Sequence, residues 1–169
     1  MSNWIAVGLI GAASAWAIAK CSESSDGKPR AGICDGLAPT AQAATIDVSR
    51  STNSPDLHVA VNCDGSGVRS IGESMITVID VLPRTYETGS PELVKFLADL
   101  DAVGDVSAIP ASPANPNIAL SECAKSVSFG TITTITAQGK TSGDMQCLKN
   151  PTPPVTALAA DCKVLAPWP

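Results

Sequence analysis

Residues 57–67 have the sequence LHVAVNCDGSG, which is typical of a β-strand followed by a tight turn. Every second side chain from Leu57 to Val61 is apolar, as expected for a strand that buries one of its faces. The Asp-Gly-Ser-Gly sequence that follows favours a turn. By the same alternation Cys63 lies on the apolar face, whereas His58 lies on the opposite face and is expected to point towards solvent. A sheet therefore forms the centre of the predicted fold.

Three further segments have strand-like patterns. Apolar and polar residues alternate in 45–49, and residues 75–82 are apolar on both faces, which predicts a central strand covered on both sides. Residues 127–137 are rich in Thr and Ile, but their alternation slips at Thr133 and Thr134, which predicts a β-bulge. We therefore expect four or five strands, mostly antiparallel.

The clearest helix in the sequence begins near residue 90. Ser90 suits the N-cap, Pro91 suits the first helical position, and Glu92 suits the positive end of the helix dipole. Gly104 is a natural stop. The apolar residues between these ends recur at helical spacing and are Leu93, Phe96, Leu97, Leu100 and Val103. We predict one amphipathic helix here, and a proline-rich loop with a short apolar segment after Cys147.

Residues 4–19 form an uncharged run, WIAVGLIGAASAWAIA, that ends at Lys20. As a helix this run would be about 24 Å long, slightly less than the roughly 30 Å hydrocarbon core of a bilayer. We predict an apolar N-terminal helix that contacts a lipid bilayer or the hydrophobic centre of an assembly. The side chains expected to make this contact are Trp4, Ile5, Val7, Leu9, Ile10, Trp16 and Ile18.

Three interpretations of this run stay open. It is a retained membrane anchor, a signal peptide cleaved at the Ala-x-Ala sequence of residues 17–19, or a buried core helix. The bases that follow it, Lys20, Lys28 and Arg30, favour a cytoplasmic location for the rest of the chain under the positive-inside rule. The cysteines favour the opposite side of the membrane.

The six cysteines include no Cys-x-x-Cys pair, and the chain has a single His, which argues against a metal site and a thioredoxin-type motif. An even number of cysteines behind a candidate export signal predicts three disulfides in an oxidising compartment. The candidates are Cys21, Cys34, Cys63, Cys123, Cys147 and Cys162. Short loops favour the pairs Cys21–Cys34 and Cys147–Cys162, and Cys63 would then pair with Cys123. Six reduced, buried cysteines are the alternative.

The predicted fold is therefore α+β, with an apolar N-terminal helix followed by a small, disulfide-stapled, mostly antiparallel β-rich domain. Residues 1–20 form the helix, and residues 21–44 form a Ser-, Gly- and Pro-rich arm held by a disulfide. Residues 45–169 form the domain. The predicted location is extracytoplasmic, in the periplasm, on the cell surface or in a virion, with the N-terminal helix as the tether.

The composition excludes several classes of function. Charged residues make up 16% of the chain, the net charge is −5, and Lys and Arg do not cluster, so no nucleic-acid partner is expected. No phosphate-binding loop or dinucleotide fingerprint is present, so no cofactor is predicted. Asp99, Asp101 and Asp105 lack the ligand spacing of a calcium loop and are interpreted as the polar face and end of the helix. His58 has no Ser and acid beside it that would indicate a catalytic triad, and no catalytic residue is predicted.

These features predict a non-catalytic structural or interaction subunit whose partners are other subunits of one assembly or copies of itself. The low charge fits this role, because the cores of subunit interfaces are depleted in charge. The layout is similar in outline to that of pilins, which join an apolar N-terminal helix to a sheet and often close a C-terminal disulfide loop. Ile5 stands where type IV pilins carry a Glu. A secretion-apparatus or virion component, a secreted binding module with a cleaved N-terminus, and a small extracellular hydrolase are the alternatives.

Overall fold

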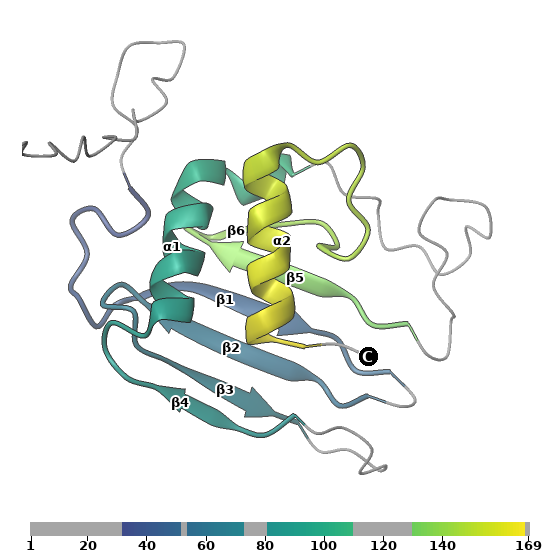
Figure 1. Cartoon of the computed structure of the whole chain (residues 1–169), viewed down its shortest axis with the longest axis horizontal. Coiled ribbons are helices and arrows are strands. Elements are labelled where there is room, and N and C mark those ends of the chain that lie inside the picture. The colour runs from purple at the N-terminus through teal and green to yellow at the C-terminus, as the bar shows by residue number, and fades with distance from the viewer. Residues whose placement is uncertain (1–31, 52–53, 73–80, 110–129, 168–169) are drawn as a thin grey trace, which may run out of the picture. The chain divides into compact units, whose positions relative to one another are not determined.

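The computed structural model describes residues 32–51, 54–72, 81–109 and 130–167. Figure 1 shows that these residues form a six-stranded sheet with two α-helices on one of its faces. All the strand pairs are antiparallel, and the order β4-β3-β2-β1-β5-β6 places β1 and β2 at the centre. The prediction of an antiparallel, β-rich domain is confirmed.

The strands are β1 (Gln42–Val48), β2 (Leu57–Asn62), β3 (Gly67–Ile71), β4 (Arg84–Tyr86), β5 (Thr133–Ala137) and β6 (Lys140–Thr141). The helices are α1 (Pro91–Val103), a short 3₁₀ turn η1 (Val106–Ala108) and α2 (Pro153–Leu165). No helix within the described ranges is both long and apolar enough to span a bilayer. The helix predicted at 4–19 lies outside those ranges.

The centre of the core lies along β1, which pairs with β2 on one side and with β5 on the other. Ile46 pairs with Val59 on one side and with Ile135 on the other, and all three side chains are fully buried. The strands predicted at 45–49 and 57–61 are thus confirmed as β1 and β2. Of the strand predicted at 75–82, residues 75–80 lie outside the described ranges, and residues 81 and 82 belong to no strand.

The bulge predicted at Thr133 and Thr134 is wrong. The β1–β5 register is continuous, and the irregularity lies between Gln42 and Ala44, where β1 pairs with β2. Thr133 occupies a core-facing position and is fully buried. The core tolerates its hydroxyl group because that group accepts a hydrogen bond of 2.7 Å from the side-chain amide of Gln146. A buried threonine with a hydrogen-bonded hydroxyl group therefore interrupts the apolar sequence pattern but not the strand.

Helix α1 has the predicted bounds. Ser90 precedes it, Pro91 opens it, and Gly104 ends it with a φ of +74°. Gly67 allows this helix to lie close to the sheet. A β-carbon at Gly67 would collide with the backbone oxygen of Ala60 and would lie 2.8 Å from Cδ1 of Leu93 on α1.

Helix α2 corrects the prediction of a loop and a short apolar segment after Cys147. The two prolines, Pro153 and Pro154, lie in the first turn of the helix, where a missing backbone N–H costs nothing. Arg69 on β3 reaches the opposite end and donates a hydrogen bond of 3.1 Å from Nη1 to the backbone oxygen of Leu165. Its Nη2 also donates to the backbone oxygen of Leu82, at 2.8 Å. The buried face of the helix consists of Val155, Leu158, Asp161, Cys162 and Leu165.

The cysteines pair differently from the prediction. Cys34 forms a disulfide with Cys63, with a Cα–Cα distance of 5.5 Å, which excludes both Cys21–Cys34 and Cys63–Cys123. Cys147 is also disulfide-bonded, to a partner outside the described residues, and Cys162 is a buried free thiol. The predicted pair Cys147–Cys162 and the prediction of three disulfides are therefore wrong.

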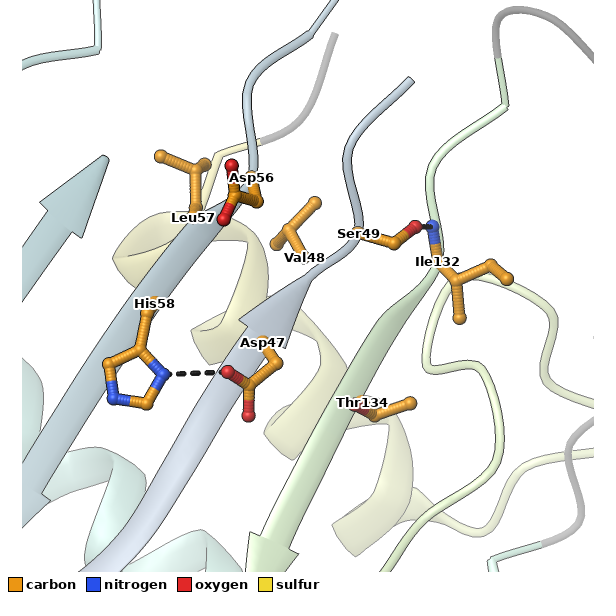
Figure 2. A pocket seen from close by; sticks show the side chains of 8 residues that line it. All are labelled: Asp47, Val48, Ser49, Asp56, Leu57, His58, Ile132 and Thr134. Carbon is orange, nitrogen blue, oxygen red and sulfur yellow. Dashed lines mark hydrogen bonds and ion pairs between the residues drawn. The ribbon is translucent and has the colours of Figure 1, made fainter. Parts of the chain in front are cut away.

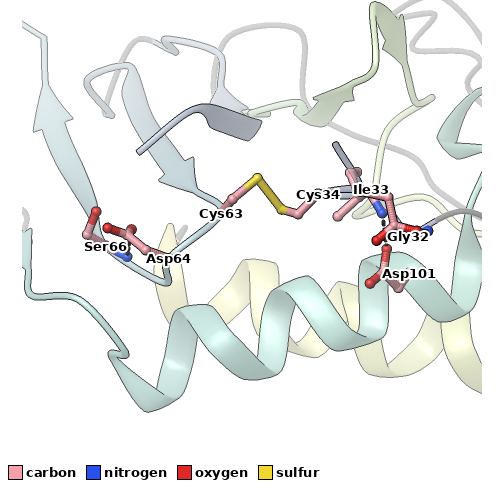
Figure 3. Close-up of a disulfide and its surroundings, with 8 residues drawn as sticks. Gly32, Ile33, Cys34, Cys63, Asp64, Ser66 and Asp101 are labelled. Atoms are coloured by element: carbon pink, nitrogen blue, oxygen red, sulfur yellow. Dashed lines mark hydrogen bonds between the residues drawn. A yellow bond between two sulfur atoms is a disulfide. The ribbon is translucent and has the colours of Figure 1, made fainter. Parts of the chain in front are cut away.

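The path of the arm that precedes β1 explains why Cys34 pairs with Cys63. Residues 32–41 run along the end of β2, where the backbone N–H of Cys63 donates to the oxygen of Ala41 at 3.0 Å and that of Asp64 donates to Pro39 at 2.7 Å. These bonds place Cys34 beside Cys63, although the two are 29 positions apart. Ile33 is buried, and its N–H donates to a carboxylate oxygen of Asp101 on α1 at 2.5 Å (Figure 3).

Candidate functional site: the open face of the sheet

The face of the sheet opposite α1 and α2 is covered by no helix of the described residues. We call it the open face, and its strand side chains include Thr45, Asp47, His58, Ala60, Val68, Ser70, Thr85, Thr134, Thr136 and Thr141. They alternate with the core-facing side chains on the same strands, so their placement follows from the pleat of the sheet. The open face carries hydroxyl groups, one carboxylate and one imidazole, and no Lys or Arg.

The most specific contact on the open face joins Asp47 and His58. The two residues pair directly across β1 and β2, and Nδ1 of His58 lies 2.6 Å from Oδ1 of Asp47. The second carboxylate oxygen of Asp47 accepts a hydrogen bond of 2.9 Å from the hydroxyl group of Thr45. The imidazole is therefore oriented through Nδ1, and Nε2 points away from this contact (Figure 2). The prediction that His58 points towards solvent is confirmed.

A hollow of about 480 Å³ lies beside this pair, at the end of the sheet where β1 ends and β2 begins (Figure 2). Its lining combines polar side chains with the apolar side chains of Val48, Leu57 and Ile132. At its rim the backbone N–H of Ile132 donates to the hydroxyl group of Ser49 at 2.8 Å, which ties β1 to the segment before β5. The lining residues are Asp47, Val48, Ser49, Asp56, Leu57, His58, Ile132 and Thr134.

An imidazole oriented by a carboxylate has the geometry of a general base, but a hydroxyl nucleophile must lie within reach of its second nitrogen. In the described part of the chain, no hydroxyl group is hydrogen-bonded to Nε2 of His58. The nearby hydroxyl of Ser70 donates to the backbone oxygen of His58 at 3.5 Å. Those of Thr45 and Ser49 are engaged with Asp47 and Ile132. The hydroxyl groups of Thr45, Ser49 and Ser70 thus make hydrogen bonds to groups other than Nε2 of His58.

A second charged cluster joins the two helices. Nζ of Lys95 on α1 lies 2.7 Å from a carboxylate oxygen of Asp99 and 2.5 Å from one of Asp161 on α2. The Asp161 side chain is 10% exposed, and its Oδ2 is buried without a hydrogen-bond partner in the described structure. Burial raises the pKa of Asp161, whereas the hydrogen bond from Lys95 opposes this shift. The pKa of the adjacent Cys162 is raised by its burial and by the charge of Asp161.

The three aspartates singled out at the end of α1 do not converge on one point. Asp99 binds Lys95, Asp101 accepts the N–H of Ile33, and Asp105 lies 2.6 Å from Nζ of Lys140. The hydrogen bond from Lys140 lowers the pKa of Asp105 to about 2. Within the described ranges, no group of three His, Cys, Asp or Glu side chains is placed to hold a metal ion.

Sequence reasoning placed His58 correctly but missed its partner and the hollow. Asp47 could have been found from the alternation of 45–49, which puts it on the same polar face, once the register of β1 against β2 is known. The predicted contact residues between Trp4 and Ile18, together with Cys21 and Cys123, lie outside the described ranges. Comparison with known proteins gives no match to a protein-family model, a curated protein or a solved structure.

Proposed function

We propose that this chain is a non-catalytic interaction subunit of an extracytoplasmic assembly, tethered through residues 4–19 to a membrane or to the centre of the assembly. The observation that carries the proposal is the disulfide between Cys34 and Cys63. Structural disulfides persist in oxidising compartments and are rare where glutathione keeps thiols reduced. This disulfide also fastens residue 34 of the arm to the end of β2.

The open face is the proposed contact surface. It offers hydroxyl groups and a hollow, and Val68 on it is 49% exposed. Interfaces between subunits combine an apolar centre with hydrogen bonds and bridging water, and they are depleted in Lys and Glu. The absence of Lys and Glu from the described side chains of the open face agrees with that depletion.

Hydrolysis is less well supported than binding. A small hydrolase would use His58 as its general base, but the hydroxyl groups of Thr45, Ser49 and Ser70 are hydrogen-bonded elsewhere. The Asp47–His58 pair is also half exposed, whereas a catalytic imidazole works best in a site from which water is excluded.

The location and the tether are tested together on the full chain produced with its own N-terminus. Membrane flotation, the intact mass, and peptide mapping without reductant are measured on the same sample. We expect the full mass, flotation with the membrane fraction, and a linked peptide pair that contains Cys34 and Cys63. A mass that corresponds to residues 20–169 would instead support the secreted module with a cleaved leader. Alkylation of Cys34 and Cys63 without reductant, in the unfolded as well as the native protein, would mean that the disulfide does not form and would overturn the proposal.

The contact surface is tested with a photo-crosslinking amino acid at one of two matched valines. Val68 on β3 belongs to the open face, and Val94 lies on α1; both are 49% exposed. In the native membrane we expect crosslinked products from position 68 and few from position 94. Equal yields at the two positions, or products from position 94 alone, would exclude the open face as the contact surface.

A further inference from the structure

We infer that the hollow beside the Asp47–His58 pair is a binding site for a guanidinium group, which an arginine side chain of a partner subunit supplies. This inference rests on the proposed function, because the hollow adjoins the proposed contact surface and the inference names the group that enters it. Figure 2 shows the side chains that carry the inference, on the neighbouring ends of β1 and β2.

The polar side chains of the hollow offer mainly hydrogen-bond acceptors. Asp47 and Asp56 contribute carboxylates, which only accept, and the lining contains no Lys or Arg. Because the carboxylate of Asp47 accepts from His58, Nδ1 of the imidazole carries a hydrogen, and in the neutral ring Nε2 is then an acceptor as well. A ligand that satisfies these groups brings hydrogen-bond donors and positive charge, as arginine and lysine side chains do.

The carboxylate of Asp56 is held in place by its own strand and by a glycine on the next one. The ladder between β2 and β3 continues past both strands, where the N–H of Gly72 donates to the backbone oxygen of Asp56 at 2.9 Å. A β-carbon at Gly72 would collide with the carboxylate, so this glycine leaves the space that the Asp56 side chain occupies. No ion pair joins Asp56 to another described residue, and its charge is therefore uncompensated within the described ranges.

The two carboxylates are spaced for one planar cation. Asp47 pairs with His58, two positions after Asp56, so Asp47 and Asp56 are diagonal neighbours across β1 and β2. The backbones of diagonal neighbours on antiparallel strands lie about 7–8 Å apart. A guanidinium group has donors along several edges of its plane and can reach both carboxylates, whereas an ammonium group is a compact point charge.

The surroundings of the carboxylates also favour arginine over lysine. The His58 side chain is 48% exposed, and guanidinium groups stack on aromatic faces. Ile132 lines the same hollow and offers an apolar surface to the methylene groups of the arginine stem. Interfaces between subunits are enriched in arginine and depleted in lysine. Arg50 of this chain follows Ser49 but is not among the lining residues, so it is not the group that fills the described hollow.

The first test is an NMR titration of the full chain, isotope-labelled and held in a non-ionic detergent at pH 8, with Nα-acetylarginine amide. Nα-acetylcitrulline amide, in which a neutral urea replaces the guanidinium group, is the matched probe. The chain contains one His, so its imidazole signals report on the hollow without ambiguity. We expect saturable shifts of these signals with the arginine probe and smaller, unsaturated shifts with the citrulline probe. Equal shifts with the two probes, or no saturation with either, would overturn the inference.

Two variants that each remove one negative charge separate the hollow from the net charge of the chain. Asp56→Asn removes a lining carboxylate, whereas Glu87→Gln removes an exposed one beside Tyr86, at the opposite end of the sheet. We expect Asp56→Asn to weaken binding of the arginine probe about two- to fivefold, the usual effect of an exposed ion pair. Glu87→Gln should leave binding unchanged. Equal weakening in the two variants, or none in Asp56→Asn, would contradict the assignment of the site.

Crosslinking in the native membrane tests the source of the guanidinium group. With the photo-crosslinking amino acid at position 68, Asp56→Asn should lower the yield of products and Glu87→Gln should not. Products with the same yield in both variants would refute arginine recognition while leaving the contact surface in place. Saturable binding of the arginine probe without any product from position 68 would instead refute the contact surface and, with it, the partner subunit as the source. The inference and the proposed function therefore fail with different results.

Discussion

Nζ of Lys95 on α1 lies 2.5 Å from Oδ1 of Asp161 on α2, and this ion pair joins the two helices at the rim of the core. Its acidic member is nearly buried and its basic member is 60% exposed. Water can therefore solvate the ammonium group of Lys95 but not the second carboxylate oxygen of Asp161. The ion pair holds the helices in register while it keeps an incompletely satisfied charge inside the protein.

Replacing Asp161 with Asn should remove the cost of burying a charged carboxylate at neutral pH. Because burial raises the pKa of Asp161 above its usual 3.8, the folded protein takes up this proton more readily than the unfolded chain. The contribution of Asp161 to stability is thus fully present below pH 3.8 and is lost as the pH rises through the raised value. We expect Asp161→Asn to unfold at an equal or higher urea concentration than the parent chain at pH 7. A loss of stability that is larger at pH 7 than at pH 4 would contradict this assignment.

Acid should destabilise the domain by protonating carboxylates whose pKa is lowered in the folded state, such as that of Asp105. Hydrogen bonds from Lys140 and from Ser107 lower the pKa of Asp105 to about 2, so its contribution is present above pH 3.8 and is lost as the pH falls through about 2. Asp105→Asn should therefore flatten the acid limb of the unfolding curve. Circular dichroism between pH 5 and pH 2 measures the effect, and Asp56→Asn, which alters an exposed acid without an ion pair among the described residues, is the control.

Gly67→Ala should lower the free energy of unfolding by about 1–3 kcal/mol, the usual cost of overpacking. The added methyl group would meet the backbone oxygen of Ala60, which cannot move away as a flexible side chain could. Urea denaturation measures the loss, and Val68→Ala at the next, outward-facing position should change stability far less. Equal stability of the two variants would show that the β2–β3 backbone and Leu93 can move enough to accommodate the methyl group.

Cys162 should resist alkylation in the native protein. Its side chain is fully buried and its pKa is raised, so the thiolate form that reacts with iodoacetamide is both inaccessible and rare. Mass spectrometry should find Cys162 unmodified until guanidinium chloride unfolds the domain. Cys162→Ser should cost about 1–3 kcal/mol, because a hydroxyl group would be buried in its place. Modification of Cys162 at the rate of a small thiol would refute its burial.

The Cys34–Cys63 disulfide should contribute about 3.5 kcal/mol to stability on the chain-entropy model for a loop of this length. Cys34→Ser/Cys63→Ser should therefore lower the free energy of unfolding by about that amount in urea. Reductant should shift the parent chain towards the variant and leave the variant nearer its starting value, apart from the effect of reducing Cys147. A variant as stable as the parent chain would mean that the arm is held by its hydrogen bonds alone.

The parts of the fold that local pattern determines were predictable. Helix α1 has a capping residue, a proline at its first position and a terminal glycine in the expected places. β2 alternates without interruption from Leu57 to Val61. Helix α2 was not predicted because the prolines of its first turn are equally typical of a loop. Val155, Leu158, Cys162 and Leu165 nevertheless have helical spacing.

The candidate site depends on pairing that local pattern does not contain. Asp47 meets His58 because β1 and β2 pair in one register, and a slip by one residue would turn their side chains to opposite faces. The disulfide was mispredicted for a related reason. Short loops favoured pairs of cysteines that are close in sequence. The arm instead lies against the end of β2 and brings Cys34 next to Cys63, although the two are 29 positions apart.

The sheet order also sets when each strand can find its partner while the chain is being synthesised. Asp47 on β1 can pair with Thr134 on β5 only after the long stretch of chain between them has been synthesised. Helix α2, which covers the core, comes later still, and Arg69 finds its partner at Leu165 near the very end of the chain. Until β5 has been made, one backbone edge of the central strand β1 therefore has no partner strand.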